Sequence, residues 1–110
     1  MTTNDLEISC EDLGAGLASG EKIRLVDCRE PFEYELVRLS DSELVPMNQT
    51  PEHLDDYRAC EVPQVVYCHH GMRSLQVVRW LREQGVENVR SLAGGIDYWS
   101  VAIDRSVSRY

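Results

Sequence analysis

Short apolar runs and amphipathic segments alternate along the whole of this 110-residue chain. The apolar runs are aliphatic and partly β-branched, which is typical of strands buried on both faces of a sheet. They predict strands at 23–27, 44–46, 64–67 and 89–92. Helices are expected between them, at 10–19, 50–59, 74–84 and 96–103. Strands and helices that alternate in this way predict an α/β fold with a central parallel sheet of about five strands flanked by helices.

Capping residues set the expected helix boundaries. Ser9 is a predicted N-cap because Asp12 follows three residues later, a variant of the capping box, and Gly20 is the expected stop. Thr50 followed by Pro51 predicts an N-cap and the first helical residue of another helix. Leu75, Val78 and Leu81 give the helix at 74–84 one apolar face.

Domain organisation is expected to be simple. No repeat, low-complexity tract or linker divides the sequence, so residues 1–110 are interpreted as a single domain, and 43% hydrophobic residues suffice for a core. The apolar runs are far shorter than the ~20 residues of a membrane helix, and the first residues show no secretory signal. We therefore expect a cytoplasmic protein without a membrane partner.

The charge of −8 is unevenly distributed. Residues 1–60 hold 14 acidic against 5 basic residues, whereas residues 61–110 hold 5 acidic against 6 basic residues. No clustered basic face is visible, which argues against a nucleic-acid partner. An anionic substrate would be repelled by the overall field, so it would need a local positive site, expected in the second half.

The chain has four cysteines and no Cys-x-x-Cys pair: Cys10, Cys28, Cys60 and Cys68. In a cytosolic chain this pattern predicts neither a disulfide framework nor a four-cysteine zinc site. We expect structural roles for Cys10, Cys28 and Cys60. Cys28 adjoins Asp27 and Arg29, so a resolving thiol is the alternative reading for it.

Cys68 has the most informative surroundings. The buried run at 64–67 delivers it to the carboxyl end of a strand, where parallel sheets bind ligands, and the loop 68–73 leads into a helix. Loop amides and a helix N-terminus lower the pKa of a cysteine placed there, which predicts a thiolate. A small buried hydrophobe is the alternative reading of Cys68. Two histidines, a glycine and an arginine directly after it are poor core residues and favour the reactive reading.

Three segments together resemble the single-domain rhodaneses, a family of sulfurtransferases. The segment 68–74 is similar to the active-site loop of that family and reads Cys-His-His-Gly-Met-Arg-Ser. The segment 25–35 is similar to its Asp-x-Arg-x-x-x-Glu-Tyr pattern, and 92–99 to its Gly-Gly-x-x-x-Trp signature. The three lie in the family's order over residues 8–100, and Gly94-Gly95 is expected to permit a tight turn near the site.

The resemblance implies an activity. A rhodanese-type sulfurtransferase would move a sulfane sulfur from thiosulfate or another persulfide donor through a Cys68 persulfide to a thiol, cyanide or carrier-protein acceptor, with no cofactor and no metal. The substrate-binding residues it implies are His69, His70, Gly71, Met72 and Arg73. The loop amides would stabilise the outer sulfur, and Arg73 would hold the sulfonate of thiosulfate.

Supporting roles are expected for three further residues. Ser74 is interpreted as a cap or loop brace at the helix start. Asp27 and Arg29 lie at a strand end, where Arg29 could pair with Glu33 or Glu35 and so pin the loop. His69 and His70 have an alternative reading as solvent-facing side chains, and a Cys68/His69/His70 metal site is disfavoured because adjacent residues converge poorly on one ion.

One departure points to a subfamily. Where the family often has His-Ile-Pro-Gly-Ala, this chain has Arg38-Leu39-Ser40-Asp41-Ser42, which leaves the shape of that loop open. This arginine and the ending from Trp99 onward resemble rhodanese domains fused to sulfur-carrier adenylyltransferases. That resemblance implies a sulfur-carrier protein or a cysteine desulfurase as partner.

Two other functions remain open from the sequence. A sulfur-relay interaction module would act only with a protein partner, for which the acidic first half offers a docking face. A cysteine-based phosphatase or arsenate reductase would also use a thiolate in a ring of amides. Such phosphatases place arginine six positions after the cysteine, whereas here Ser74 stands at that position and Arg73 one earlier.

Overall fold

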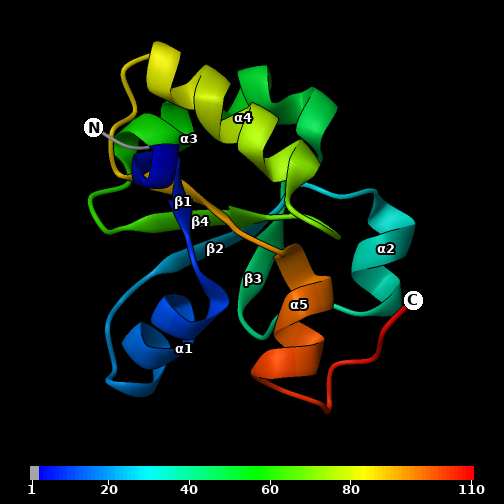
Figure 1. The fold of residues 1–110 in the computed structure, drawn as a ribbon. Helices are drawn as coiled ribbons and strands as arrows, with labels where there is room; N and C mark the ends of the chain where they lie inside the picture. Colours follow the sequence, from blue (N-terminus) through cyan, green and yellow to red (C-terminus); the bar gives the residue numbers. More distant parts are fainter. Residues whose placement is uncertain (1–2) are drawn as a thin grey trace.

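A computed structural model describes residues 3–110 of the chain. Its centre is one parallel sheet of five strands in the order β1-β5-β4-β2-β3 (Figure 1). The strands are β1 (Glu7–Ile8), β2 (Arg24–Asp27), β3 (Ser42–Leu44), β4 (Gln64–Tyr67) and β5 (Val89–Leu92). The predicted α/β class with a five-stranded parallel sheet is confirmed.

Helices cover both faces of this sheet. The α-helices are α1 (Cys10–Ala18), α2 (Pro31–Leu36), α3 (Leu54–Ala59), α4 (Met72–Glu83) and α5 (Gly95–Ala102). Two 3₁₀ helices, η1 (Thr3–Leu6) and η2 (Met47–His53), precede β1 and α3. Helices α3 and α4 lie above the sheet in Figure 1, and α1 and α5 lie below it. The radius of gyration of the Cα atoms is 12.8 Å.

The alternation of side chains along β2 and β4 produces two buried clusters, one on each face of the sheet. Val26 and Val66 point to the α3/α4 side and belong to one buried cluster, whereas Leu25 and Val65 belong to a second cluster on the α1/α5 side. Strand β4 is buried along its whole length. Both faces of the central strands must therefore be apolar, which is the pattern that the sequence shows.

Local sequence signals placed most element boundaries correctly. The strands at 64–67 and 89–92 occur as predicted, and the strand predicted at 44–46 lies two residues earlier. The amide of Asp12 donates to Ser9 Oγ at 3.0 Å, so the predicted cap is present. Helix α4 begins two residues before the predicted start, which places Met72 and Arg73 in its first turn rather than in the loop.

The prediction that Thr50 caps a helix is wrong. Thr50 lies inside η2, which begins at Met47, and the α-helix α3 begins only at Leu54. The buried Thr50 hydroxyl has no hydrogen-bond partner among the described residues. The short elements β1 and α2 were not predicted, because two and six residues are too few to show a period.

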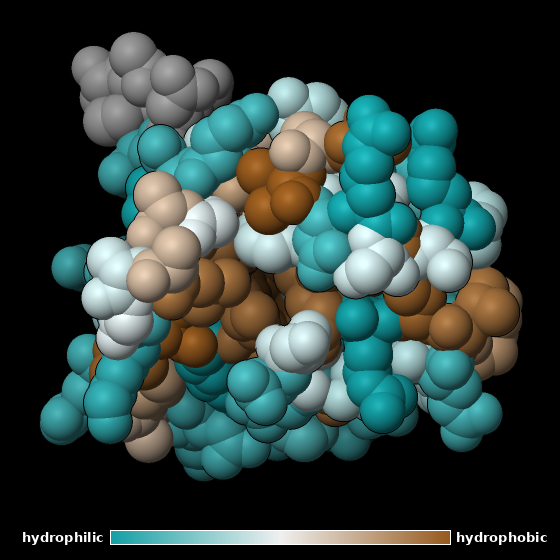
Figure 2. All heavy atoms as spheres, turned by 90° about the horizontal axis from the view of Figure 1, so that it is seen from below, coloured by the Kyte–Doolittle hydropathy of each residue, from teal (hydrophilic) through white to brown (hydrophobic). Residues whose placement is uncertain are grey.

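Hydrophilic side chains cover much of the α1/α5 face, and hydrophobic side chains line a hollow in it (Figure 2). Between residues 3 and 110, no helix has both the length and the apolar character that crossing a membrane requires.

Candidate active site

Cys68 follows the last residue of β4 and lies at the carboxyl end of the sheet. Its Sγ accepts hydrogen bonds from two backbone amides, that of Gly71 at 3.1 Å and that of Ser74 at 3.3 Å. The Ser74 hydroxyl lies 3.5 Å from the same sulfur. The loop and the first turn of α4 therefore curl around this sulfur and direct N–H groups at it, an arrangement that favours an anion.

Backbone conformation at two glycines makes this arrangement possible. Gly71 has φ +105°, in the region open to glycine, and directly precedes α4. At Gly95, a Cβ would collide with the carbonyl oxygens of Cys68 and His69. The space left free there lets α5 approach the loop, so that the amides of Ile96 and Asp97 donate to those two carbonyls at 2.9 and 3.0 Å. The N-terminus of α5 thus holds the loop carbonyls, consistent with the turn expected at Gly94-Gly95.

The surroundings of Cys68 favour its thiolate. A hydrogen bond from the Cys28 thiol has the largest effect, and the Ser74 hydroxyl and the amides of Ser74 and Gly71 act in the same direction. Together they outweigh burial and lower the pKa of Cys68 to about 4. The main-chain amides, which were expected to lower this pKa, do contribute, but Cys28, for which a structural role was expected and a resolving thiol was the alternative, contributes most.

Ser74 connects the loop to the neighbouring strand β5. Its side chain is fully buried, donates to the carbonyl of Gly71 at 3.3 Å and lies 2.7 Å from Ser91 Oγ. Through these contacts Ser74 links α4 to β5 while its hydroxyl and amide face Cys68. The loop-brace role expected for Ser74 agrees with this geometry.

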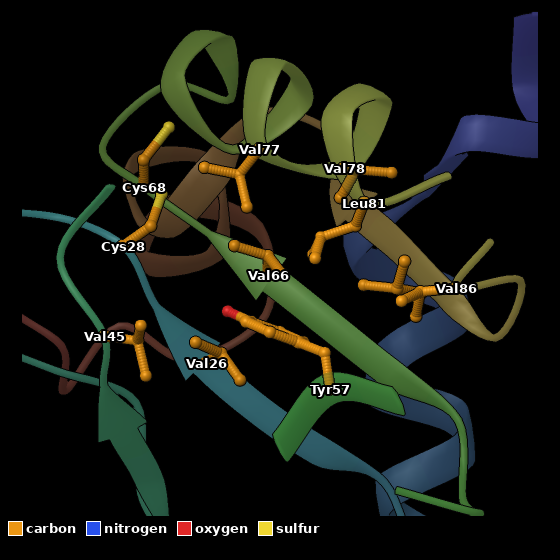
Figure 3. Close-up of a cluster of buried hydrophobic side chains, with 11 residues drawn as sticks. Val26, Cys28, Val45, Tyr57, Val66, Cys68, Val77, Val78, Leu81 and Val86 are labelled. Atoms are coloured by element: carbon orange, nitrogen blue, oxygen red, sulfur yellow. The ribbon is translucent and has the colours of Figure 1, made fainter. Parts of the chain in front are cut away.

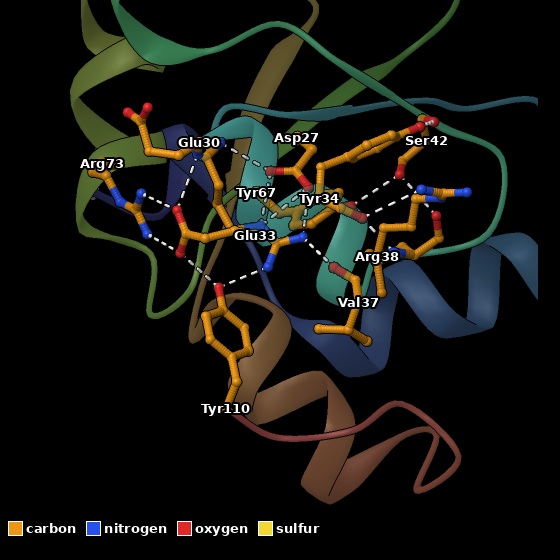
Figure 4. Close-up of polar contacts among 12 residues, drawn as sticks. Asp27, Glu30, Glu33, Tyr34, Val37, Arg38, Ser42, Tyr67, Arg73 and Tyr110 are labelled. Carbon is orange, nitrogen blue, oxygen red and sulfur yellow. Dashed lines mark hydrogen bonds and ion pairs between the residues drawn. The ribbon is translucent and has the colours of Figure 1, made fainter.

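A polar network lies beside the loop (Figure 4). Arg73 makes two hydrogen bonds with the buried carboxylate of Glu33, at 2.8 and 3.1 Å, and holds the pKa of Glu33 down to about 2. The hydroxyl of Tyr110 donates a hydrogen bond to Glu33 at 2.8 Å and accepts one from Arg29 at 2.6 Å.

The expected pairing of Arg29 with Glu33 or Glu35 is wrong: Arg29 pairs with Asp27 at 2.6 Å, and both side chains are fully buried. The buried guanidinium of Arg29 pairs with the carboxylate of Asp27, two residues earlier at the same strand end. The carboxylate of Glu33 pairs with Arg73 instead.

His69 and His70 stack on each other with ring centroids 4.0 Å apart, and Tyr110 stacks on His69 at 4.1 Å. His70 is exposed, whereas His69 is partly buried, and its Nε2 has no hydrogen-bond partner among the described residues. Burial and the neighbouring His70 lower the pKa of His69. The alternative reading of the two histidines as solvent-facing side chains therefore fits His70 and not His69.

The only described group of side chains with metal-ligand spacing is His69, His70 and Asp97, whose ligand atoms lie within 4.8 Å of one another. The two adjacent histidines do come together here, but with Asp97 as the third member rather than Cys68. The carboxylate of Asp97 is, however, already bound by Arg109 at 3.0 and 3.1 Å. Cys68 is not a member of the group.

The structure brings two of the predicted residues, Gly71 and Ser74, to the Cys68 sulfur, and it adds Tyr110, which sequence reasoning missed. Gly71, Ser74 and Cys68 are in direct contact, whereas Asp27 and Arg29 form a separate buried pair. Cys28 and Glu33 were considered from the sequence, but as a structural cysteine or resolving thiol and as a partner of Arg29. No signal in the sequence pointed to Tyr110, because its contacts with Glu33 and Arg29 join positions 77 and 81 residues apart.

The fold and the site define a parallel α/β domain in which a buried cysteine accepts two amide hydrogen bonds at the carboxyl edge of the sheet. Residues 9–102 match the family described as rhodanese-like domain, and the chain belongs to that family. A sulfurtransferase of Allochromatium vinosum is 38% identical over 98 residues, which cover 86% of this chain and 87% of that protein. The thiosulfate sulfurtransferase GlpE of Pseudoalteromonas translucida is 31% identical, covering 84% and 88% of the two chains.

Longer relatives contain a similar domain as one part. The chloroplastic rhodanese-like/PpiC domain-containing protein 12 of Arabidopsis thaliana is 33% identical, and the match covers 82% of this chain but 31% of that protein. Among solved structures, a rhodanese-like domain protein of Staphylococcus aureus superposes with a TM-score of 0.79 at 23% identity, covering 94% and 97% of the two chains, which supports the fold. Family membership and the names of these relatives support a rhodanese-type transferase.

Proposed function

We propose that this domain carries a sulfane sulfur as a persulfide on Cys68, taken from thiosulfate or another persulfide donor and passed to a thiol, cyanide or a carrier protein. The observation that supports this most directly is the pair of amide hydrogen bonds to Cys68 Sγ, from Gly71 and Ser74. A sulfur held in this way is a nucleophile at neutral pH.

The first step is a displacement at sulfur. The Cys68 thiolate attacks the outer sulfur of the donor, and the donor's S–S bond breaks as the Cys68–sulfur bond forms. With thiosulfate as donor, sulfite leaves with the electron pair of the broken bond. The chain needs no external reductant for this step, because the two electrons stay with the leaving group.

The second step passes the sulfur on. An acceptor thiolate or cyanide attacks the outer sulfur of the persulfide, and Cys68 leaves as a thiolate. The same amides and the Ser74 hydroxyl that stabilise the resting thiolate stabilise this leaving group. A thiolate of low pKa leaves readily, so the site serves both steps.

The donor site has less free positive charge than the sequence suggests. Glu33 already neutralises Arg73, whose side chain is 35% exposed. We propose that the exposed edge of Arg73 meets the sulfonate of thiosulfate while Glu33 holds the other edge. A donor without charge at its far end, such as an alkyl persulfide, would bind without this contact.

A protein acceptor is supported by the surface next to the Glu33–Arg73 pair. Phe32, Leu36 and Met72 are 69%, 62% and 73% exposed, an unusual exposure for large apolar side chains. The probable adenylyltransferase/sulfurtransferase MoeZ of Mycobacterium tuberculosis is 28% identical to this chain. The match covers 94% of this chain and 26% of that longer protein. We propose a sulfur-carrier protein or a cysteine desulfurase as the partner that these side chains contact.

Mass spectrometry of the intact protein tests the proposal. After incubation with thiosulfate and desalting, the chain should gain the mass of one sulfur atom, and cyanide should remove it. Cys68→Ser should not gain the sulfur, whereas the matched variant Cys60→Ser should gain it as the wild type does. Sulfur found on Cys60→Ser and Cys68→Ser alike would refute Cys68 as the carrier.

A further inference from the structure

The two cysteines that follow β2 and β4 are neighbours in the sheet. Asp27 and Tyr67 are partners in the parallel ladder, and the amide of Cys28 donates to the carbonyl of Tyr67 at 3.0 Å. The ladder therefore brings Cys28 next to Cys68. Neighbouring strands lie about 4.8 Å apart, within the Cα separation that a disulfide spans.

Their side chains share one face of the sheet. Cys28 and Cys68 belong to the same buried cluster as Val26 and Val66, two residues earlier on each strand, and each is 1% exposed. Figure 3 shows the Cys28 sulfur directed toward Cys68. Both cysteines are free, and the Cys28 thiol is the largest of the influences that lower the pKa of Cys68. The other two cysteines, Cys10 and Cys60, lie outside this cluster.

We propose that Cys28 is a resolving thiol: when no acceptor is present, it displaces the outer sulfur of a Cys68 persulfide as hydrosulfide and leaves a Cys28–Cys68 disulfide. This gives the domain a second activity, the reductive release of sulfide, in addition to sulfur transfer. The inference rests on the proposed persulfide of Cys68.

The step balances without an outside oxidant. The sulfur of Cys28 attacks Cys68 Sγ, one S–S bond forms between the two cysteines, and the bond from Cys68 to the outer sulfur breaks. The outer sulfur leaves with that electron pair and takes the proton of Cys28, so the sulfane sulfur is reduced to sulfide while the two cysteines are oxidised. Two molecules of a small thiol then reopen the disulfide and become a disulfide themselves.

The environment of Cys28 makes disulfide formation slower than transfer of the sulfur to an acceptor. Its hydrogen bond to Cys68 and its burial raise the pKa of Cys28, so it stays protonated and attacks slowly. An acceptor that reaches the outer sulfur takes it first. Without an acceptor, the internal thiol removes the sulfur and blocks the irreversible oxidation to which an exposed sulfur is open.

The test follows a loaded persulfide over time. Wild type, Cys28→Ser and Cys60→Ser are loaded with thiosulfate or inorganic polysulfide, desalted, and incubated without acceptor under argon. Serine keeps a hydrogen-bond donor beside Cys68 but cannot form the disulfide. We expect wild type and Cys60→Ser to release one equivalent of sulfide and to end lighter than the reduced chain by two hydrogen atoms. Cys28→Ser should keep its extra sulfur and release no sulfide.

Peptide mapping of the wild type without reductant provides a readout that does not depend on the folding of a variant. A peptide pair joined through Cys28 and Cys68 is expected after sulfide release. Equal loss of sulfur from wild type and Cys28→Ser, or sulfide release without the joined peptides, would overturn the resolving role and leave sulfur transfer intact. Failure of the wild type to load from either donor would overturn both proposals.

Discussion

Arg73 and Glu33 hold each other by two parallel hydrogen bonds, from Nη1 to Oε1 at 2.8 Å and from Nη2 to Oε2 at 3.1 Å. The pair joins the first turn of α4 to α2 across 40 positions of sequence. It places the cation next to the loop and at the same time neutralises it. The charge that a donor experiences at this site is therefore set by both residues.

Removing the charge of Glu33 and removing the charge of Arg73 should shift donor preference in opposite directions. Glu33→Gln releases the charge of Arg73 and should lower KM for thiosulfate by about threefold, whereas Arg73→Gln should reduce kcat/KM for thiosulfate by about tenfold. Turnover of an uncharged alkyl persulfide should change much less in both variants. Steady-state kinetics with the two donors measures this, and equal changes for both donors would remove Arg73 from sulfonate recognition.

The ionisation of Cys68 predicts a pH profile. Because the pKa of Cys68 is lowered to about 4, its thiolate should persist throughout the neutral range and disappear only as the pH falls through that value. Cys28→Ala removes the group that lowers this pKa most, so its titration midpoint should lie higher. Ultraviolet thiolate absorbance, taken as the difference from Cys68→Ser, measures both midpoints. A wild-type midpoint near the ordinary value of about 8.5 would contradict the assigned environment.

Gly95 should be the glycine least tolerant of substitution. Gly95→Ala should lower the free energy of unfolding by about 3 kcal/mol, because its Cβ meets two loop carbonyls and its φ is +62°. Gly20→Ala is the matched control, since φ is +86° there with nothing within 4 Å, and should cost about 1 kcal/mol. Urea denaturation compares the two, and equal losses would show that backbone strain alone matters.

The buried Asp27–Arg29 pair should be costly to break. Arg29→Met leaves the carboxylate of Asp27 without its guanidinium in a site closed to solvent, which should cost about 3–5 kcal/mol. Glu43→Gln breaks an ion pair with Arg24 in which Glu43 is 55% exposed, and should cost less than about 1 kcal/mol. Thermal unfolding of both variants tests the contrast. Similar losses would mean that the burial of Asp27 does not determine the cost.

Local patterns predicted the elements near Cys68 because strand burial, a glycine turn and an amphipathic helix are all encoded within the stretch 64–84. The contacts that tune the site depend on which strands are neighbours. Cys28 meets Cys68 only because β2 lies beside β4, and Glu33 meets Arg73 only because α2 follows β2. Hydrophobic periodicity carries no information on strand order, so these pairings lay beyond the sequence argument.

The hold of α5 on the loop ties the reactive cysteine to the order of synthesis. Ile96 and Asp97, whose amides bind the carbonyls of Cys68 and His69, are synthesised after the loop. A nascent chain that has exposed Cys68 but not yet α5 therefore lacks the hydrogen bonds that hold the loop carbonyls. The surroundings of Cys68 are complete only once α5 has been synthesised and has folded against the loop.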